Sequence, residues 1–231
     1  MIKSLLRKII EKNYLERNQK SDNYLHKLIY KGYIKRYLFC KNFFSNKRIL
    51  DVACGDGFGS YLLSENNKKV IGLDIDKYQI KNNKSNFIRR NLDFMVGDAT
   101  NLKFKNNYFD AIVSFETIEH TQNTNQFLSE LKRVLKKDGF LLISSINKKF
   151  TKGLFKDEKI NKFHLREFTK EELIEDISKY FKIISIYRQR PIRKNVFVKY
   201  LDILGYIIKS PIIVRDSEDI SGTNNIILCK K

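Results

Sequence analysis

The chain has 231 residues, a length that suits one α/β domain with additions or two very small domains. Hydrophobic residues make up 42%, enough to bury a substantial core, and this excludes a generally disordered chain. A formal net charge of +19, from 45 Lys and Arg against 26 Asp and Glu, favours an anionic partner unless the lysines are only a solvated surface.

The first 47 residues are predicted to form a helical cap (1–47). Ile and Leu residues recur at helical spacing over about residues 2–18, with basic residues between them. Such a helix either packs on its own domain or lies on a membrane surface, so peripheral membrane contact stays open. A second helical stretch runs from about Tyr24 to Phe44.

Several features predict a cytoplasmic protein without a transmembrane segment. The start of the chain lacks the long apolar core of a signal peptide. The most apolar late stretch, 195–214, is interrupted by three charged residues and should not span a bilayer. Cys40, Cys54 and Cys229 lie far apart without metal-binding spacing, which is typical of reduced thiols.

From residue 48 onward, short apolar runs alternate with helical patterns. This alternation requires parallel pairing with right-handed crossovers. We therefore expect an α/β fold: a Rossmann-like, doubly wound, seven-stranded, mostly parallel sheet with the N-terminal helical cap, in which 48–231 is one structural unit with a helical insertion at about 191–222. Strands are expected at 48–54, 69–75, 92–99, 109–116, 140–146, 181–189 and 224–230, and helices at 59–67, 77–87, 121–139 (ended by Gly139) and 168–180 (with a Thr169/Glu172 capping box).

The stretch ILDVACGDGFG, residues 49–59, is predicted to be a ligand-binding turn. In an open parallel sheet, ligands bind beyond the carboxyl ends of the strands, where the strand order switches. Gly55 and Gly57 permit a tight turn and close approach of the backbone to a ligand, and Gly59 lets the next helix pack on the strand. The spacing is G-x-G-x-G, which differs from the G-x-G-x-x-G of dinucleotide binders.

Acidic residues surround this turn and indicate the kind of ligand. Asp74 and Asp98 end the second and third strands, and Asp51 and Asp56 flank the turn itself. Asp74 is at a distance suited to binding ribose hydroxyls, and Asp51 could orient the turn and attract a cationic amino group. A pyrophosphate would be repelled by these carboxylates, whereas a ribose, an ammonium and a sulfonium would not. The pattern points to S-adenosylmethionine.

The ordered set ILDVACGDGFGS, GLDID, GDAT, FDAIVSFETIEH and LKRVLKKDGFLLIS resembles the class I S-adenosylmethionine-dependent methyltransferases over roughly residues 45–150. The resemblance implies that the turn holds the methionine part of the cofactor and that an arginine on the upstream helix meets its carboxylate. It also implies residues for the ribose, for the adenine and for the far side of the site. The implied set is Ala53, Cys54, Gly55, Gly57 and Gly59 in the turn, Arg36 upstream, Asp74 at the ribose, Asp98 with Ala99 at the adenine, Phe115 with Glu116 at the far side, and Ile75 as a further cofactor-binding residue.

A second group of residues could carry the chemistry. In SFETIEH, Glu116, Glu119 and His120 have the spacing that places them on one face of a helical turn, and His164 precedes the capped helix downstream. Two carboxylates and two imidazoles could hold a divalent metal such as Mg, Mn, Co or Zn with open positions for substrate oxygens. Alternatively, either histidine acts as a general base without metal, or only packs.

This second group resembles three methyltransferase branches. They are bacterial enzymes of glycan and sugar gene clusters, small-RNA 3′-terminal 2′-O-methyltransferases, and ubiquinone-pathway O-methyltransferases. In such a site a metal chelated by a vicinal diol lowers the pKa of the hydroxyl and aligns its oxygen with the sulfonium.

These observations predict an O-methyltransferase acting on a sugar or glycan hydroxyl in a surface-polysaccharide or nucleotide-sugar pathway. The acceptor is expected to be a sugar, glycan or nucleotide-sugar, with anionic character matching the basic chain. RNA ribose 2′-O-methylation is the alternative that the net charge favours, although no RNA-binding motif is evident. A non-catalytic cofactor-binding partner subunit is the third interpretation.

Overall fold

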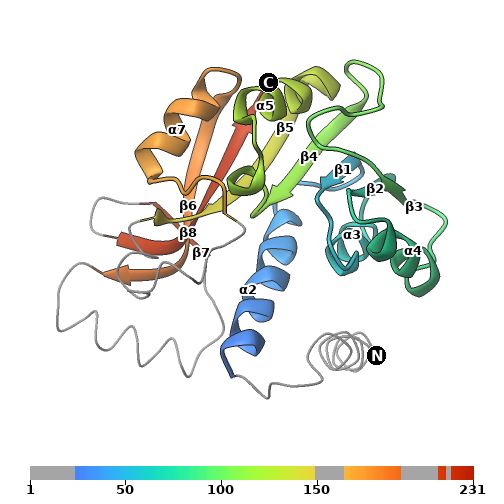
Figure 1. The fold of residues 1–231 in the computed structure, drawn as a ribbon, viewed down its shortest axis with the longest axis horizontal. Coiled ribbons are helices and arrows are strands. Elements are labelled where there is room, and N and C mark those ends of the chain that lie inside the picture. Colours follow the sequence, from blue (N-terminus) through green and yellow to red (C-terminus); the bar gives the residue numbers. More distant parts are fainter. Residues whose placement is uncertain (1–23, 149–163, 194–212, 217–219) are drawn as a thin grey trace.

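The computed structural model describes residues 24–148, 164–193, 213–216 and 220–231, so the helix expected at 2–18 lies outside the described residues. The described chain forms one sheet with helices on both faces (Figure 1). None of the described helices combines the length and the apolar character that crossing a membrane requires.

The elements follow one another in the order that the sequence predicts. The helices are α2 (Tyr24–Cys40), α3 (Phe58–Leu63), α4 (Lys77–Asn86), the 3₁₀ turn η1 (Ile118–His120), α5 (Thr124–Val134) and α7 (Lys170–Ser178). The strands are β1 (Arg48–Val52), β2 (Lys69–Asp74), β3 (Leu92–Val96), β4 (Phe109–Phe115), β5 (Leu135–Ile146), β6 (Lys182–Arg193), β7 (Ile213–Arg215) and β8 (Ile220–Lys230).

The strand order places a crevice at the centre of the sheet. The strands lie in the order β3-β2-β1-β4-β5-β8-β6-β7, with parallel pairing from β3 to β5 and β8 antiparallel to both β5 and β6. From β1 the chain moves outward to β2 and β3, and then returns to the other side of β1 as β4. The strand order therefore switches between β1 and β4, and their carboxyl ends define the expected ligand site.

Two apolar layers hold the helices onto the sheet. On one face, α5 and α7 pack through residues such as Phe127, Leu131 and Leu173; on the other, α2, α3 and α4 pack through residues such as Tyr37, Phe58 and Ile80. Strands β1 and β4 are buried on both faces, which explains why they read as continuous apolar runs in the sequence. The predicted Rossmann-like α/β fold with a mostly parallel sheet and an N-terminal helix is confirmed.

Three expected boundaries differ from the structure. The described sheet has eight strands instead of seven, because β7 adds a short strand along β6. Helix α5 ends at Val134 instead of Gly139, since Leu135 already pairs with Phe109 of β4. Where a helical insertion was expected at 191–222, the described positions are strands, while 194–212 and 217–219 lie outside the described residues. The Thr169/Glu172 capping box is present as expected.

Helix α2 closes one side of the crevice by packing directly on the glycine turn. A Cβ atom added to Gly59 would lie 2.1 Å from Cζ of Tyr37, so only glycine allows this ring to approach. The Tyr37 ring also makes an edge contact with Phe115 of β4, with 5.1 Å between the ring centroids. The third glycine of the turn therefore allows α2 to pack closely against α3.

This contact predicts that Gly59→Ala destabilises the fold by about 1–3 kcal/mol or more, because the added methyl group overpacks against Tyr37. Urea unfolding of the purified protein measures the loss. The same substitution in a Tyr37→Ala background should cost clearly less, since the ring is then absent. Equal costs in the two backgrounds would show that the ring does not impose the glycine.

Candidate cofactor and acceptor site

The glycine turn after β1 has a backbone that most residues avoid. Ala53, Gly55 and Gly57 have φ values of 57°, 53° and 75°, in the left-handed region. Gly57 begins α3, and a Cβ atom added there would lie 2.6 Å from Cγ of Asn83. A Cβ atom added to Gly55 would meet nothing within 4 Å, so open space lies beside the turn at this position. The turn is therefore tightly packed at Gly57, on the side that faces Asn83, and open at Gly55.

A buried carboxylate, that of Asp51, connects the elements around the turn by hydrogen bonds. Asp51 is fully buried at the end of β1, and it accepts hydrogen bonds from Tyr37 Oη (3.0 Å) and Ser60 Oγ (2.6 Å). Burial raises the pKa of Asp51 to about 7, and the nearby Asp74 and Asp56 add to the effect, while the two hydroxyl donors oppose it. Asp51 is thereby connected to α2 and α3, the two helices that flank the turn.

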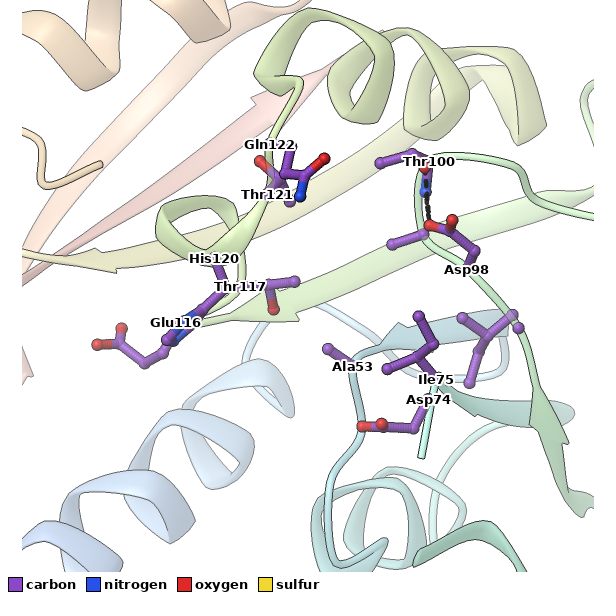
Figure 2. A pocket seen from close by; sticks show the side chains of 13 residues that line it. Ala53, Asp74, Ile75, Asp98, Thr100, Glu116, Thr117, His120, Thr121 and Gln122 are labelled. Carbon is purple, nitrogen blue, oxygen red and sulfur yellow. Dashed lines mark hydrogen bonds between the residues drawn. The ribbon is translucent and has the colours of Figure 1, made fainter. Parts of the chain in front are cut away.

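Asp74 and Asp98 occupy the strand ends beside the turn. Asp74 accepts hydrogen bonds from the backbone N–H of Gly55 (2.8 Å) and of Asp76 (3.0 Å), so its carboxylate is fixed at the crevice. Asp98 Oδ1 accepts from the backbone N–H (2.7 Å) and the hydroxyl (2.8 Å) of Thr100. Both side chains line the cavity shown in Figure 2.

The cavity opens at the carboxyl ends of β1, β2, β3 and β4. Its volume is about 450 Å³, within the range of roughly 300–1,000 Å³ typical of small-molecule sites. Ile75 is 72% exposed and offers an apolar surface there. The lining residues are Ala53, Leu73, Asp74, Ile75, Gly97, Asp98, Ala99, Thr100, Glu116, Thr117, His120, Thr121 and Gln122.

Several predicted cofactor residues lie outside this lining. Asp51 and Cys54 are fully buried under the turn, Phe115 is buried against α2, and the glycines form the turn itself. Arg36 of α2 is 6% exposed and donates from Nη1 to Gln189 Oε1 at 2.5 Å.

Glu116 does not share a helical face with Glu119 and His120, contrary to the expectation from their spacing. Its φ of 52° is left-handed, so it precedes the 3₁₀ turn instead of belonging to a helix. Its two carboxylate oxygens accept from Ser144 Oγ (2.6 Å) and Asn224 Nδ2 (2.7 Å). In Figure 2 the carboxylate points away from Asp74 and Asp98, toward the side of β5 and β8.

Glu119, His120 and His164 do come together. One ligand atom from each lies within 4.8 Å of the others, and the two imidazole rings are 4.9 Å apart in an edge arrangement. Glu119 is fully buried, and neither carboxylate oxygen has a hydrogen-bond partner among the described residues. Burial, reinforced by the Glu116 carboxylate, raises the pKa of Glu119 to about 8, although the nearby Ser145 side chain and the backbone at Glu119 and Ile146 oppose the rise.

The segment that carries His164 is held by the backbone of the same turn. The N–H groups of Leu165 and Arg166 donate to the carbonyl oxygen of Glu119, at 2.9 and 3.2 Å. His164 Nδ1 lies 3.3 Å from Glu167 Oε1, which favours the tautomer protonated at Nδ1 and leaves Nε2 as the acceptor. Two segments that are distant in the sequence therefore meet at one set of donor atoms.

These donor atoms fit a divalent cation. A buried carboxylate without hydrogen bonds is costly unless it is protonated or paired with a cation. One carboxylate and two imidazoles match the ligand preferences of several transition metals. Glu116, the fourth predicted ligand, is instead occupied by Ser144 and Asn224.

Comparison with known proteins identifies the family. Residues 50–143 match the family described as a methyltransferase domain. A probable S-adenosylmethionine-dependent methyltransferase of Mycolicibacterium smegmatis is 33% identical over 132 residues, which cover 57% of this chain and 50% of that protein. The ubiquinone biosynthesis O-methyltransferase of Pelagibacter ubique is 31% identical over 112 residues, covering 48% of this chain and 46% of that protein. The chain thus spans about half the length of the curated relatives it matches.

A solved structure shares the whole fold. The S-adenosylmethionine-dependent methyltransferase of Thermotoga maritima, described as a possible histamine N-methyltransferase, superposes with a TM-score of 0.68 at 20% identity. The match covers 89% of this chain and 90% of the other. The switch-point crevice, the glycine turn with Asp74 and the family match agree that residues 50–143 are an S-adenosylmethionine-dependent methyltransferase domain, and the chain has the class I fold.

The cavity also contains residues that sequence reasoning did not select. Thr117, Thr121 and Gln122 line the cavity from the segment after β4, and Thr100 lines it from the segment after β3. Thr100 is the last residue of the GDAT motif and Thr117 lies within ETIEH, while Thr121 and Gln122 directly follow ETIEH. Their position after the strand ends was the available signal.

The raised pKa of Asp51 predicts a specific pH dependence of stability. Between about pH 4 and pH 7 the folded protein binds more protons at Asp51 than the unfolded chain, since the pKa rises from 3.8 to about 7. The stabilisation is therefore complete below about pH 4 and is lost as the pH rises through about 7. Relative to Asp51→Asn, the wild type should lose up to a few kcal/mol of unfolding free energy over this window.

Urea unfolding of both proteins at about pH 5, 6, 7 and 8 measures this difference. A difference in unfolding free energy that stays constant across the series would contradict the raised pKa. Asp93→Asn, at an exposed carboxylate on β3, provides the control for removing one negative charge.

Proposed function

We propose that the protein transfers a methyl group from S-adenosylmethionine to a hydroxyl oxygen of a sugar or glycan. The observation that carries this proposal is the cluster of Glu119, His120 and His164 beside the cavity, at which His120 is a lining residue. Its oxygen and nitrogen donors suit an acceptor with neighbouring hydroxyls. The Pelagibacter ubique relative, named as an O-methyltransferase, supports an oxygen acceptor.

In the proposed cofactor site, each part of the ligand has a partner of matching chemistry. The fixed carboxylate of Asp74 would accept hydrogen bonds from the ribose hydroxyls, and Ile75 with Ala99 would pack against the adenine near Asp98. The open outer side of the turn at Gly55 would take the methionine part. When bound, S-adenosylmethionine supplies an electrophilic methyl group on a sulfonium, so the protein needs chiefly to position the acceptor in line with it.

The histidines provide a route for the hydroxyl proton. His164 Nε2 is the proton acceptor if Glu167 holds the proton on Nδ1. His120 lies beside it with 4.9 Å between the ring centroids and lines the cavity. Alternatively, His164 Nε2 is a metal ligand instead of a base: a divalent cation held by Glu119, His120 and His164 would then lower the pKa of a bound hydroxyl.

RNA ribose 2′-O-methylation is the second candidate. The net charge of +19 favours it, and the same three side chains would suit a ribose that carries neighbouring hydroxyls. Salt-sensitive binding of RNA distinguishes this candidate from the first.

The proposed contact of Asp74 with the ribose hydroxyls predicts that Asp74→Ala weakens binding of S-adenosylhomocysteine about 10–100-fold, since a hydrogen-bonded carboxylate contributes roughly 1.5–3 kcal/mol. Isothermal titration calorimetry measures the affinity. Asp93→Ala removes an exposed carboxylate from neighbouring β3 and should leave binding unchanged. Absence of binding by the wild type would refute the cofactor assignment.

The acceptor part is tested with radiolabelled S-adenosylmethionine and a panel of nucleotide-sugars, oligosaccharides and short RNAs. We expect methyl transfer to a sugar hydroxyl, loss of at least about 100-fold in His164→Ala, and inhibition by a chelator that added Mn²⁺ reverses. Transfer only to RNA would select the second candidate, and transfer only to an amine would exclude both.

Titration of the protein with Mn²⁺, without cofactor or acceptor, identifies the metal ligands independently of enzymatic activity. Glu119→Gln should abolish binding, whereas Glu116→Gln should retain it, because the Glu116 oxygens are already bound by Ser144 and Asn224. Equal loss in both variants would instead support the four-ligand set expected from the sequence. No binding by the wild type would reject the metal and leave the histidines as the proposed base.

A further inference from the structure

Arg36 is a buried cation without an anionic partner in the described part of the chain. It is 6% exposed, and no carboxylate of the described residues pairs with it. Its Nε is buried without a hydrogen-bond partner in the described part of the chain. Its guanidinium carbon lies 5.8 Å from the centroid of the Phe115 ring. A buried charge of this kind is costly unless an anion compensates it.

Arg36 lies close to the glycine turn. Tyr33, one helical turn earlier on α2, donates to Asp56 Oδ1 at 3.1 Å and lies 3.4 Å from the carbonyl oxygen of Cys54. Tyr37, the next residue after Arg36, binds Asp51 beneath the turn. Arg36 thus lies on α2 between two residues that contact the turn or the carboxylate beneath it, and its guanidinium lies against Phe115 at the end of β4.

Gln189 of β6 fixes the Arg36 side chain. Gln189 is fully buried, its Oε1 accepts from Arg36 Nη1 at 2.5 Å, and its Nε2 donates to the carbonyl oxygen of Gly32 at 2.8 Å. Both ends of one amide are thus bound to α2, although 153 residues separate Gln189 from Arg36. A neutral amide holds the guanidinium in place without neutralising its charge.

The strand pair that carries Gln189 also holds Glu116. Gln189 is opposite Asn224 in the register of β6 and β8, and Asn224 Nδ2 donates to Glu116 Oε2. The Thr223 hydroxyl connects the two positions by contacting both the Gln189 carbonyl oxygen and Asn224 Oδ1. Two paired residues of β6 and β8 therefore bind a cation, Arg36, and a carboxylate, Glu116.

We propose that Gln189 is a positioning residue that orients Arg36 to bind the carboxylate of the cofactor's amino-acid part. The inference rests on the proposed function, since S-adenosylmethionine is the ligand whose carboxylate would occupy this place. The C-terminal antiparallel strands then contribute to cofactor recognition through α2, and not only to the acceptor side.

The test compares S-adenosylmethionine with its decarboxylated analogue, which lacks only the carboxylate. The wild type should bind the complete cofactor about 10–100-fold more tightly, as expected for a charged hydrogen-bonded pair. Gln189→Met, which keeps the shape but loses both hydrogen bonds, should reduce this ratio about tenfold. Gln189→Glu should bring the ratio close to one, since its carboxylate would occupy Arg36 itself.

Arg188→Gln is the matched control. Arg188 lies next to Gln189 on β6 and is also buried, but it binds Asp216 and Asn225 instead of α2. Its substitution perturbs the same strand and should leave the affinity ratio at the wild-type value. A loss of stability alone lowers the affinities for both ligands by the same factor and leaves their ratio unchanged.

The outcomes distinguish failure of the proposed function from failure of the positioning role of Gln189. If the wild type binds neither ligand, the proposed function fails. If it binds both ligands equally, or if Gln189→Met and Gln189→Glu keep the wild-type ratio, the cofactor assignment stands and the role of Gln189 is overturned. A ratio that falls as far in Arg188→Gln as in Gln189→Met also overturns it.

Discussion

The hydrogen bonds of Tyr37 and Ser60 to the buried Asp51 carboxylate connect the elements around the glycine turn. Asp51 is near the end of β1, Ser60 is in α3 directly after the turn, and Tyr37 is in α2, so one carboxylate joins the strand to the two helices that flank the turn. The carboxylate is fully buried, and its two hydroxyl donors oppose the rise of its pKa. Loss of either donor would leave a buried acceptor with one hydrogen bond and would loosen the contact of the cap with Gly59.

The central fold was predictable because its signals are local. Strands β1 and β4 are buried on both faces and read as apolar runs, and the glycines after β1 are required by left-handed φ values and by the Tyr37 contact. The end of α5 was predicted too late because Gly139 looked like the stop signal. The pairing of Leu135 with β4 ends the helix earlier, and that pairing is a tertiary contact.

The candidate site was predictable in its residue types and less so in its geometry. Spacing placed Glu116 with Glu119 and His120, but the left-handed backbone at Glu116 turns its carboxylate toward Ser144 and Asn224. Both partners lie on strands far along the chain, so no local pattern could reveal them. The same limit applies to Gln189, whose contact with Arg36 joins two residues 153 positions apart.

A structure determined with S-adenosylhomocysteine tests the central claim most directly. The account predicts that the ribose hydroxyls contact Asp74, that the adenine lies between Ile75 and Ala99 near Asp98, and that the amino-acid carboxylate meets Arg36 beyond the glycine turn. A ligand bound elsewhere, or one whose amino-acid part avoids the space between Gly55 and α2, would contradict the assignment of this crevice as the cofactor site.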